Sequence, residues 1–376
     1  MKVIYDLEAY GFAPHGGIAR IFDETLARLA RKPDFSARLY APGPLQRLPV
    51  LRPRVRRCLW RAWPRSLARR GLGARMHAQL ERVYWRARRA DLFHPTFYTS
   101  VPRVGAIPWV VTIYDLIHER LEQADDMPDH AAFKAFKAAA IQRAARLICI
   151  SESTRRELLK YHTVDPDIVR VVYPGFSPVF QPIPASEAES KAERLLRLVK
   201  RPFLLYVGSR QRYKNFHRLL LAYKQWARCA ESDLVVVGAP RTLADCMAED
   251  LAGPGGMVHY VGPVSDEELR ALYALAGCFV YPSLCEGFGI PVLEAMACGC
   301  PLCLSDIPPF REVAGECAVF FDPYSQAAMH AAFDRSLEQG RADELSDAAQ
   351  AQLAKFSWDA CAEGTWAVYR ELAGER

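Results

Sequence analysis

The chain has 376 residues, a formal net charge of +6, and a composition that is 51% hydrophobic and 24% charged. These values are typical of a soluble globular protein, and the length predicts two domains of ordinary size. No apolar run approaches the ~20 residues that a membrane-spanning helix needs. The start passes directly into a predicted strand without the apolar region of a signal peptide, so we expect a cytoplasmic protein.

The eleven cysteines are an odd number, and most lie among alanine, leucine and valine. This placement predicts small core residues in a reducing compartment and no disulfide framework. Cys298, Cys300 and Cys303 are spaced closely enough to suggest a metal site. No second Cys or His cluster accompanies them, and Pro301 separates two of the thiols, so we expect no metal here.

The first predicted elements place a glycine pair at a helix start. A strand covers Lys2–Asp6, and Gly16 and Gly17 precede a helix over 19–29 with apolar residues at helical spacing. Backbone N–H groups and the positive end of the helix dipole make such a loop suitable for an anion. A plain turn is the alternative interpretation.

Residues 47–89 differ from the rest of the chain, because they hold fourteen arginines and one acidic residue, Glu81. Arginine around a helical face that carries tryptophan suits an anionic membrane surface, at ~1 kcal/mol per basic residue. A nucleic-acid surface or a solvated helical face has the same composition, and Pro53 and Pro64 interrupt any continuous helix. Since no nucleic-acid motif accompanies the segment, we expect an anionic membrane surface or a lipid-linked acceptor, and no nucleic acid.

Asp115 and His118 follow the most apolar predicted strand of the first half. Residues 108–115 form a continuous apolar run, which is typical of a buried parallel strand. Open α/β sheets bind ligands at the carboxyl ends of their strands, so this position favours function over the structural role that a lone histidine usually has. Strands at 146–150 and 168–173 alternate with helices and lack hairpin signals, which predicts a doubly wound parallel sheet.

A proline-rich linker at 177–184 precedes the second half, which begins with a buried strand at 202–208. Arg210, Arg212 and Lys214 follow that strand and precede a helix. Cations at this position are either part of a solvated loop or partners of a phosphate group whose charge they neutralise. No G-x-G-x-x-G pattern is present, so the dinucleotide fingerprint of dehydrogenases is absent.

The remainder of the second half continues the alternation of strands and helices. Buried strands are predicted at 233–238, 257–262, 277–281 and 301–305, and a last helix starts near Phe356. Two capping boxes of the form Ser-x-x-Glu mark helix starts, at Ser186 with Glu189 and at Ser265 with Glu268.

The segment 281–294 combines a glycine loop with two carboxylates. Glu286, Gly287 and Gly289 lie between a buried strand and a helix, and Glu294 lies about one turn inside that helix. Helix N-terminal N–H groups attract an anion, and the glycines let the backbone approach it closely. Taken alone, this spacing is more often a helix-entry cap at Glu286 and a solvated Glu294.

With its flanks, the segment reads Pro-Ser-x-x-Glu-Gly-Phe-Gly-x-Pro-x-x-Glu-Ala-Met-Ala-x-Gly-x-Pro over 282–301. It resembles the nucleotide-sugar signature of glycosyltransferase family 4, whose members are retaining enzymes of the GT-B fold. The likeness covers most of the chain, and residues 42–90 match least. It implies two Rossmann-like, doubly wound α/β domains that face a central cleft. These are an acceptor-side domain at 1–180, a nucleotide-sugar-binding domain at 185–355, and a C-terminal helix at 356–376 that returns to the first domain.

The resemblance also implies catalytic roles. Glu286 would bind hydroxyls of the transferred sugar, and Glu294 would bind those of the ribose. Arg210 and Lys214 would neutralise the charge of the leaving diphosphate, with Arg212 as a spare cation. No carboxylate nucleophile is implied, because a donor phosphate oxygen takes the proton of the acceptor in this family.

Further donor-binding positions follow from the same resemblance: Gly16, Gly17, Val264, Gly287, Phe288 and Gly289. Many members place a histidine directly after the central strand of the first domain, as Thr-x-His-Asp. Here that position is Tyr114, followed by Asp115, with His118 three residues later. This departure leaves open whether Asp115 or His118 contacts the reacting sugar.

We therefore expect a retaining, metal-independent hexosyltransferase, with mannose favoured, that uses a GDP- or UDP-linked sugar and no further cofactor. The acceptor would be a glycan or lipid-linked hydroxyl in the synthesis of a bacterial surface polysaccharide such as lipopolysaccharide. The Arg-rich segment would hold the protein at the inner face of the cell membrane. Two alternatives remain, a sugar-nucleotide 2-epimerase of similar fold and a non-catalytic carbohydrate- or membrane-binding protein.

Overall fold

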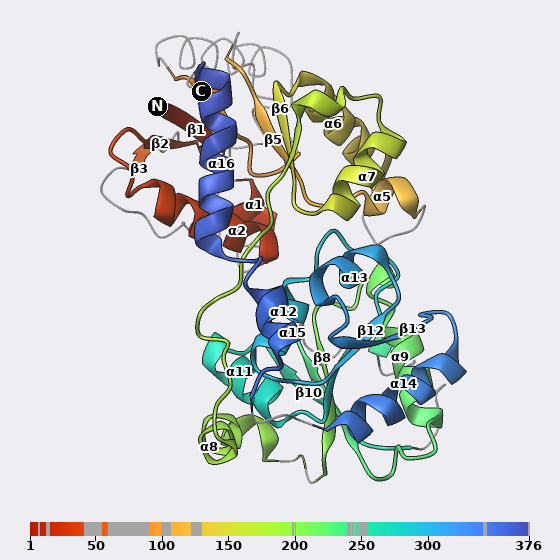
Figure 1. Ribbon diagram of the computed structural model, residues 1–376. Coiled ribbons are helices and arrows are strands. Elements are labelled where there is room, and N and C mark those ends of the chain that lie inside the picture. The colour runs from red at the N-terminus through yellow and green to blue at the C-terminus, as the bar shows by residue number, and fades with distance from the viewer. Residues whose placement is uncertain are drawn as a thin grey trace, which may run out of the picture. The chain divides into compact units, whose positions relative to one another are not determined.

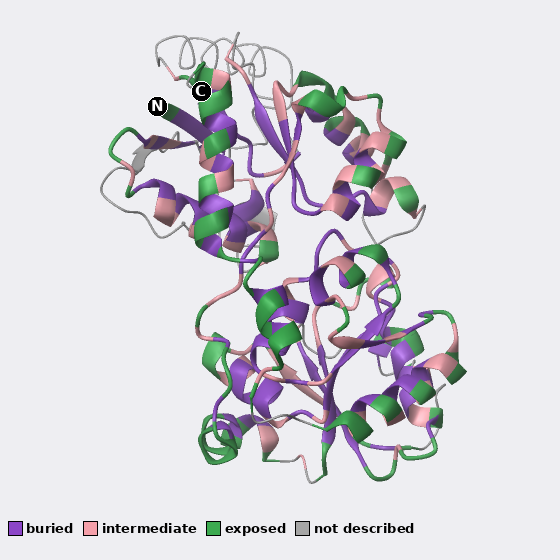
Figure 2. Cartoon of the chain, viewed as in Figure 1, coloured by how far each residue is buried: buried purple, intermediate pink, exposed green. Residues whose placement is uncertain are grey.

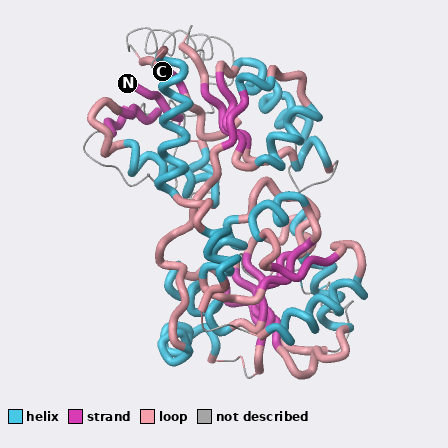
Figure 3. The backbone as a smooth tube through the Cα atoms, viewed as in Figure 1, coloured by secondary structure: helices cyan, strands magenta, loops and turns pink. Residues whose placement is uncertain are grey.

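A computed structural model describes residues 1–6, 8–12, 16–40, 55–58, 90–98, 107–121, 130–197, 199, 201–238, 242, 244–245, 247, 255–340 and 344–374. The chain divides into two units. The first comprises Met1–Glu119, Met127–Gly175 and Ser357–Arg376, and the second comprises Arg120–Asp126 and Phe176–Phe356. In both units helices flank a layer of strands (Figure 1 and Figure 3).

All strand pairs of the first unit are parallel. The strands are β1 (Lys2–Asp6), β2 (Ser36–Tyr40), β3 (Val55–Cys58), β4 (Leu92–Phe93), β5 (Val110–Ile113), β6 (Arg146–Cys149) and β7 (Val169–Val171). One sheet has the order β3-β2-β1-β4, the other has the order β5-β6-β7, and a bridge between Phe93 and Trp109 joins them. The strand order reverses between β1 and β4, so the loops after these strands open where α/β sheets bind ligands.

The helices of this part of the chain connect and cover these strands. They are α1 (Ala9–Phe12), α2 (Gly17–Leu29), α5 (Ile117–Arg120), α6 (His130–Arg143), α7 (Glu152–Tyr161) and α16 (Trp358–Ala373), with a 3-10 turn η1 (Pro166–Ile168) before β7. The last helix, α16, packs against α2 (Figure 1). Arg28 lies 2.8 Å from Asp359 and Lys32 lies 2.7 Å from Glu363. The C-terminal helix therefore returns to the first unit, as the sequence predicts.

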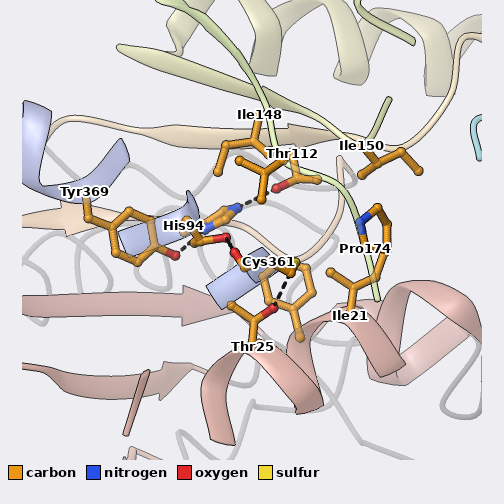
Figure 4. A pocket seen from close by; sticks show the side chains of 12 residues that line it. Ile21, Thr25, His94, Thr112, Ile148, Ile150, Pro174, Cys361 and Tyr369 are labelled. Atoms are coloured by element: carbon orange, nitrogen blue, oxygen red, sulfur yellow. Dashed lines mark hydrogen bonds between the residues drawn. The ribbon is translucent and has the colours of Figure 1, made fainter. Parts of the chain in front are cut away.

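A buried chain of hydrogen bonds links α16 to the sheet (Figure 4). The hydroxyl of Tyr369 lies 2.8 Å from that of Tyr5 and 2.6 Å from Nδ1 of His94, whose Nε2 lies 2.8 Å from Oγ1 of Thr112. Burial lowers the pKa of His94 to about 3, so the ring is neutral at physiological pH. The cavity beside it measures about 20 Å³. That is room for about one water molecule and far below the ~300 Å³ of a small-molecule pocket, so it is no sugar site.

The second unit contains one six-stranded parallel sheet of the order β10-β9-β8-β11-β12-β13. Its strands are β8 (Phe203–Val207), β9 (Asp233–Val237), β10 (Val258–Gly262), β11 (Cys278–Tyr281), β12 (Leu302–Ser305) and β13 (Ala318–Phe321). Strands β9, β11 and β12 are buried at every position, because parallel strands are covered on both faces (Figure 2).

Helices and one 3-10 turn connect these strands: α8 (Ala185–Leu196), η2 (Arg212–Lys214), α9 (Phe216–Gln225), α11 (Asp266–Leu275), α12 (Ile290–Ala297), α13 (Pro308–Ala314), α14 (Gln326–Gln339) and α15 (Asp347–Leu353). The strand order reverses between β8 and β11, because β9 and β10 lie on one side and β12 and β13 on the other. The loops after β8 and β11 therefore open at the binding edge of this sheet.

One of the two predicted capping boxes is confirmed. The Ser265 hydroxyl accepts from the backbone N–H of Glu268 at 3.2 Å, and the Glu268 carboxylate accepts from that of Ser265 at 2.9 Å. The other prediction is wrong, because α8 already begins at Ala185 after Pro184. Ser186 therefore lies inside the helix, where its hydroxyl is not at the capping position.

Most of the Arg-rich segment 47–89 lies outside the described residues, which include only the short strand β3 from it. The hypothesis that this segment binds a membrane or a lipid-linked acceptor stays a prediction. Within the described part of the chain, no helix is both long and apolar enough to cross a bilayer.

Cys298, Cys300 and Cys303 are buried and have free thiols. Their side chains belong to the core around α12 and β12. Among the residues that the structure describes, no group of three or more His, Cys, Asp or Glu side chains is arranged to hold a metal ion.

Candidate functional site

Two loops of the second unit meet at the reversal point of its sheet. One follows β8 and contains η2, and the other covers 282–289 after β11. Leu284 donates its backbone N–H to Tyr213 at 2.7 Å, and the Asn215 amide donates to the carbonyl of Pro282 at 3.0 Å. Asn215 holds a left-handed φ of 58°, which asparagine tolerates better than most residues. These contacts fix the two loops against each other.

The central contact of the site joins Lys214 to Glu286. Nζ of Lys214 lies 2.6 Å from Oε1 of Glu286 and 2.7 Å from the hydroxyl of Tyr281. The side chains of the ion pair are only 12% and 10% exposed. Burial alone would lower the pKa of Lys214, but the charge and hydrogen bond of Glu286 outweigh it and raise that pKa above its ordinary value. The lysine is therefore a cation in the free protein.

A second donor holds the same oxygen of Glu286. The hydroxyl of Ser283 lies 2.7 Å from Oε1 and donates to it. Both of these bonds go to Oε1, and the hydroxyl of Tyr281 also interacts with the Glu286 carboxylate. The carboxylate is thus anchored through one oxygen, and the other is able to accept a hydrogen bond from a hydroxyl group.

Helix α12 begins directly after the glycine loop. Gly289 precedes its first residue with φ of 113°, and a Cβ there would lie 3.0 Å from the ring of Phe310. Glu286 lies before this position and bonds Lys214 and Ser283, so it does not cap the helix. Glu294 is 3% exposed, so it is not solvated. The structure therefore excludes the more common alternative for both carboxylates.

Arg210 is held by a different carboxylate, Asp245. Nε of Arg210 lies 2.9 Å from both oxygens of Asp245, and the guanidinium lies 5.7 and 5.4 Å from the ring centroids of Phe216 and Tyr260. Thr242 donates its N–H and hydroxyl to the same carboxylate, at 2.7 and 2.8 Å. Sequence reasoning missed Asp245, because it is 35 residues from Arg210 and outside any matching motif.

The remaining candidate residues of this unit differ in the groups that they can offer to a ligand. Gly287, Phe288 and Gly289 are buried, and the Phe288 ring packs edge-on against Phe356 at 5.5 Å. We therefore expect this loop to offer backbone groups to a ligand and no aromatic face. Val264 is half-buried and directly precedes the cap of α11, after the carboxyl end of β10.

In the first unit, Gly16 and Gly17 lie at the start of α2. Gly16 is the residue before the helix, in extended conformation and with no side-chain cap, and Gly17 is exposed. The pair follows β1, whose carboxyl end lies at the reversal point of that sheet. The expected helix start with open backbone N–H groups is therefore present.

Tyr114, at the position where many family members have histidine, has a structural role. It is 4% exposed and its hydroxyl donates to the carbonyl of Thr96 at 2.9 Å. Of its neighbours, Asp115 has a side chain that is 30% exposed after β5, whereas the His118 ring packs 4.6 Å from the ring of Phe133 on α6. Which of the two contacts a sugar stays a prediction.

A buried lysine lies behind Asp115. Lys137 on α6 is 0% exposed, and its Nζ lies 2.8 Å from Glu119 and 3.8 Å from Asp115. His162 lies 3.4 Å from the other oxygen of Glu119. Burial raises the pKa of Glu119, but the contacts with His162 and Lys137 outweigh it and lower that pKa to about 2. No pattern in the sequence indicates this cluster, because a lysine in an Ala-rich helix is usually solvated.

Two family models match the chain, "Glycosyltransferase Family 4" over 15–180 and "Glycosyl transferases group 1" over 187–352. O-antigen chain mannosyltransferase B of Escherichia coli is 32% identical over 238 residues, which are 62% of this chain and 62% of that protein. The match thus spans less than two thirds of that relative. D-inositol 3-phosphate glycosyltransferase of a Nocardioides species is 30% identical over 315 residues, which are 76% of this chain and 68% of that protein.

Solved structures show the same architecture over the whole chain. The structure of Anabaena HepE in complex with UDP and glucose has a TM-score of 0.73 at 15% identity, covering 100% of this chain and 98% of that one. At this identity the likeness shows the fold alone. The predicted GT-B fold of two Rossmann-like domains is confirmed.

Proposed function

The chain belongs to glycosyltransferase family 4, and on this premise we propose that it transfers a hexose from a nucleoside-diphosphate sugar to a hydroxyl group, with retention of the anomeric configuration. The observation that carries the proposal is the contact between Lys214 and Glu286 at the carboxyl ends of β8 and β11. A cation and a carboxylate are held there in one place, at the binding edge of the sheet. A diphosphate sugar requires both, because it has negative charge at one end and hydroxyl groups at the other.

Each group has a defined task in this proposal. Lys214 and Arg210, with the backbone N–H groups at the start of α12, stabilise the negative charge that grows on the leaving diphosphate. Oε2 of Glu286 accepts hydrogen bonds from the transferred sugar. Glu294 binds the ribose hydroxyls, and Val264 lines the base.

The reaction breaks the bond between the anomeric carbon and the diphosphate oxygen and forms a bond from that carbon to the acceptor oxygen on the same face. The acceptor proton passes to an oxygen of the donor phosphate, so the products are a glycoside and a nucleoside diphosphate. The positive charge at the leaving group comes from side chains and a helix N-terminus, so the proposal includes no metal ion. Gly16 and Gly17 contact the donor phosphate or the acceptor, and Asp115 or His118 contacts the reacting sugar.

Mannose is the first choice of sugar, because the E. coli relative is named an O-antigen chain mannosyltransferase. The HepE complex contains UDP and glucose, so UDP-glucose belongs in the same donor panel as GDP-mannose. We propose a glycan or lipid-linked acceptor of a bacterial surface polysaccharide, reached at the inner face of the membrane through the Arg-rich segment.

Two substitutions test the assignment. Glu286→Ala and Lys214→Ala should each lower donor turnover by about 100-fold or more, since removal of one group that stabilises transition-state charge has an effect of that order. The matched control is the Lys191–Glu267 pair of the same unit, which is 3.1 Å apart and half-exposed. Lys191→Ala and Glu267→Ala should keep turnover within about twofold. Near-wild-type rates for Glu286→Ala or Lys214→Ala would refute the proposal.

Product analysis separates the alternatives. Wild-type protein given a nucleotide sugar and no acceptor should release free hexose slowly, since water can replace the acceptor. Accumulation of an epimeric sugar would instead indicate a 2-epimerase. Absence of both products, with binding of the nucleotide sugar retained, would indicate a non-catalytic carbohydrate-binding protein.

A further inference from the structure

The Lys214–Glu286 pair rests on two side chains that are not themselves expected to reach a substrate. Tyr281, the last residue of β11, is 2% exposed, and its ring stacks on that of Phe310 at 5.1 Å and 21°. Its hydroxyl accepts from Nζ of Lys214 at 2.7 Å. Burial raises the pKa of Tyr281 well above its ordinary value, so the phenol keeps its proton. The tyrosine therefore offers Lys214 a neutral, rigidly placed acceptor.

Ser283 supports Glu286 in the same way that Tyr281 supports Lys214. It is 0% exposed and donates its hydroxyl to Oε1 at 2.7 Å. Tyr281 ends β11 and Ser283 lies two residues beyond it, and both side chains reach the Lys214–Glu286 pair. Pro282 between them has a fixed φ, which limits rotation of this part of the backbone. One strand end thus supplies a support for the cation and a support for the carboxylate.

We propose that Tyr281 and Ser283 are positioning residues for glycosyl transfer, acting through Lys214 and Glu286. Ser283 occupies Oε1 of Glu286 together with Lys214, so Oε2 is the oxygen presented to the sugar. Tyr281 gives the ammonium of Lys214 a second partner, which holds the ammonium in place when it also binds a phosphate oxygen. This inference rests on the proposed function and names the residues that make its site rigid.

Two residues of the same unit provide matched controls. Ser305 ends β12, the strand next to β11, and is 0% exposed, yet its hydroxyl has no hydrogen bond to any described residue. Tyr273 on α11 is 0% exposed, and its hydroxyl likewise has no hydrogen-bond partner in the described part of the chain. A buried serine at a strand end and a buried tyrosine therefore do not by themselves require such bonds.

The test compares Ser283→Ala and Tyr281→Phe with Ser305→Ala and Tyr273→Phe in the full chain. Turnover is measured with whichever of GDP-mannose or UDP-glucose the wild type uses, and binding of that sugar nucleotide and of its free nucleoside diphosphate is measured by calorimetry. We expect Ser283→Ala to lower kcat at least about tenfold and to weaken binding of the sugar nucleotide, while affinity for the diphosphate stays within about twofold. Tyr281→Phe should weaken binding of both ligands, because Lys214 contacts the phosphates. Both control variants should match the wild type.

A second comparison separates positioning from a general structural effect. In a Glu286→Ala background, Ser283→Ala should change turnover by less than about twofold, because its action passes through the missing carboxylate. An equal loss in both backgrounds would overturn the inference. If thermal unfolding shows that Ser283→Ala does not fold, Ser283→Cys replaces it in both backgrounds. Its loss of turnover should be smaller than that expected for Ser283→Ala, because a thiol is a hydrogen-bond donor, although a weaker one than a hydroxyl.

The two hypotheses fail in different ways. A wild-type protein that neither turns over nor binds any sugar nucleotide would refute the proposed function, and the positioning roles with it. A wild-type protein that transfers sugar, with Ser283→Ala and Tyr281→Phe both within about twofold of it, would refute the positioning roles alone.

Discussion

At the scale of single residues, three largely buried cations in the described part of the chain pair with carboxylates that are distant in the sequence. Lys214 pairs with Glu286, Arg210 with Asp245, and Lys137 with Glu119. A buried charge without a partner costs several kcal/mol, so each pair fixes the two elements that carry its members. The first pair fixes the loops after β8 and β11, and the last fixes α5 against α6.

The contacts of Glu119 lead to a prediction of how the stability of the protein depends on pH. The pKa of Glu119 in the folded protein is about 2, below its ordinary value of 4.5. A lowered folded-state pKa stabilises the protein at pH above about 4.5, and this stabilisation is lost as the pH falls toward 2. The free energy of unfolding of Glu119→Gln should therefore lie below that of the wild type at pH 6, and the difference should be smaller at pH 3 and vanish only toward pH 2. Urea unfolding at both pH values measures this, and an equal difference at pH 6 and pH 3 would contradict it.

At the scale of elements, the sequence predicted the strands and helices that depend on apolar pattern. Continuous apolar runs became the buried strands β5, β8, β9, β11 and β12, because strands covered on both faces contain few polar residues. The glycine loop, Glu286 and Lys214 were also predicted, and the structure brings the last two into contact. Strand order was not predictable residue by residue, because it depends on contacts between segments distant in the chain.

Partners of functional residues were the main omission. Asp245 lies in a segment without a strong apolar pattern. The residues around the buried Lys137 look like those around a lysine that faces solvent. Burial depends on what packs against a helix, and the helix's own residues do not specify that. The capping prediction at Ser186 was wrong because Pro184 holds the capping position of α8, two residues before the predicted cap.

The helix α16 provides a prediction at this scale. Tyr369 makes two buried hydrogen bonds, to Tyr5 and His94, whereas Glu363 on the same helix pairs with Lys32 after α2 and has a side chain that is 67% exposed. Tyr369→Phe should lower the free energy of unfolding by about 1–3 kcal/mol, because buried polar groups lose their partner. Glu363→Ala should lower it by less than about 1 kcal/mol, as is usual for a surface ion pair. Denaturant unfolding of both variants checks this, and the reverse order of the two effects would show that α16 is held mainly by surface charge.

At the scale of the whole molecule, each unit has its own parallel strands with their own reversal point, and the residues proposed to bind the donor are divided between the two units. Lys214, Glu286, Glu294 and Arg210 all belong to the second unit, whereas Gly16 and Gly17 belong to the first. In the proposed function, the second unit therefore contains the side chains that bind the nucleoside diphosphate. Binding a ligand at 100 times its dissociation constant stabilises the folded state by about 2.7 kcal/mol.

Hydrogen exchange on the full chain with GDP or UDP tests where this stabilisation lies. We expect slower exchange in 208–216 and 282–294, because the loops after β8 and β11 would contact the phosphates and the ribose. The half-buried strand β13 of the same unit provides an internal control, since it lies at the far edge of the sheet and should change little. Lys214→Ala should abolish the protection at the same ligand concentration. Protection confined to the first unit, with 208–216 and 282–294 unchanged, would place the nucleotide elsewhere and contradict the site proposed for the second unit.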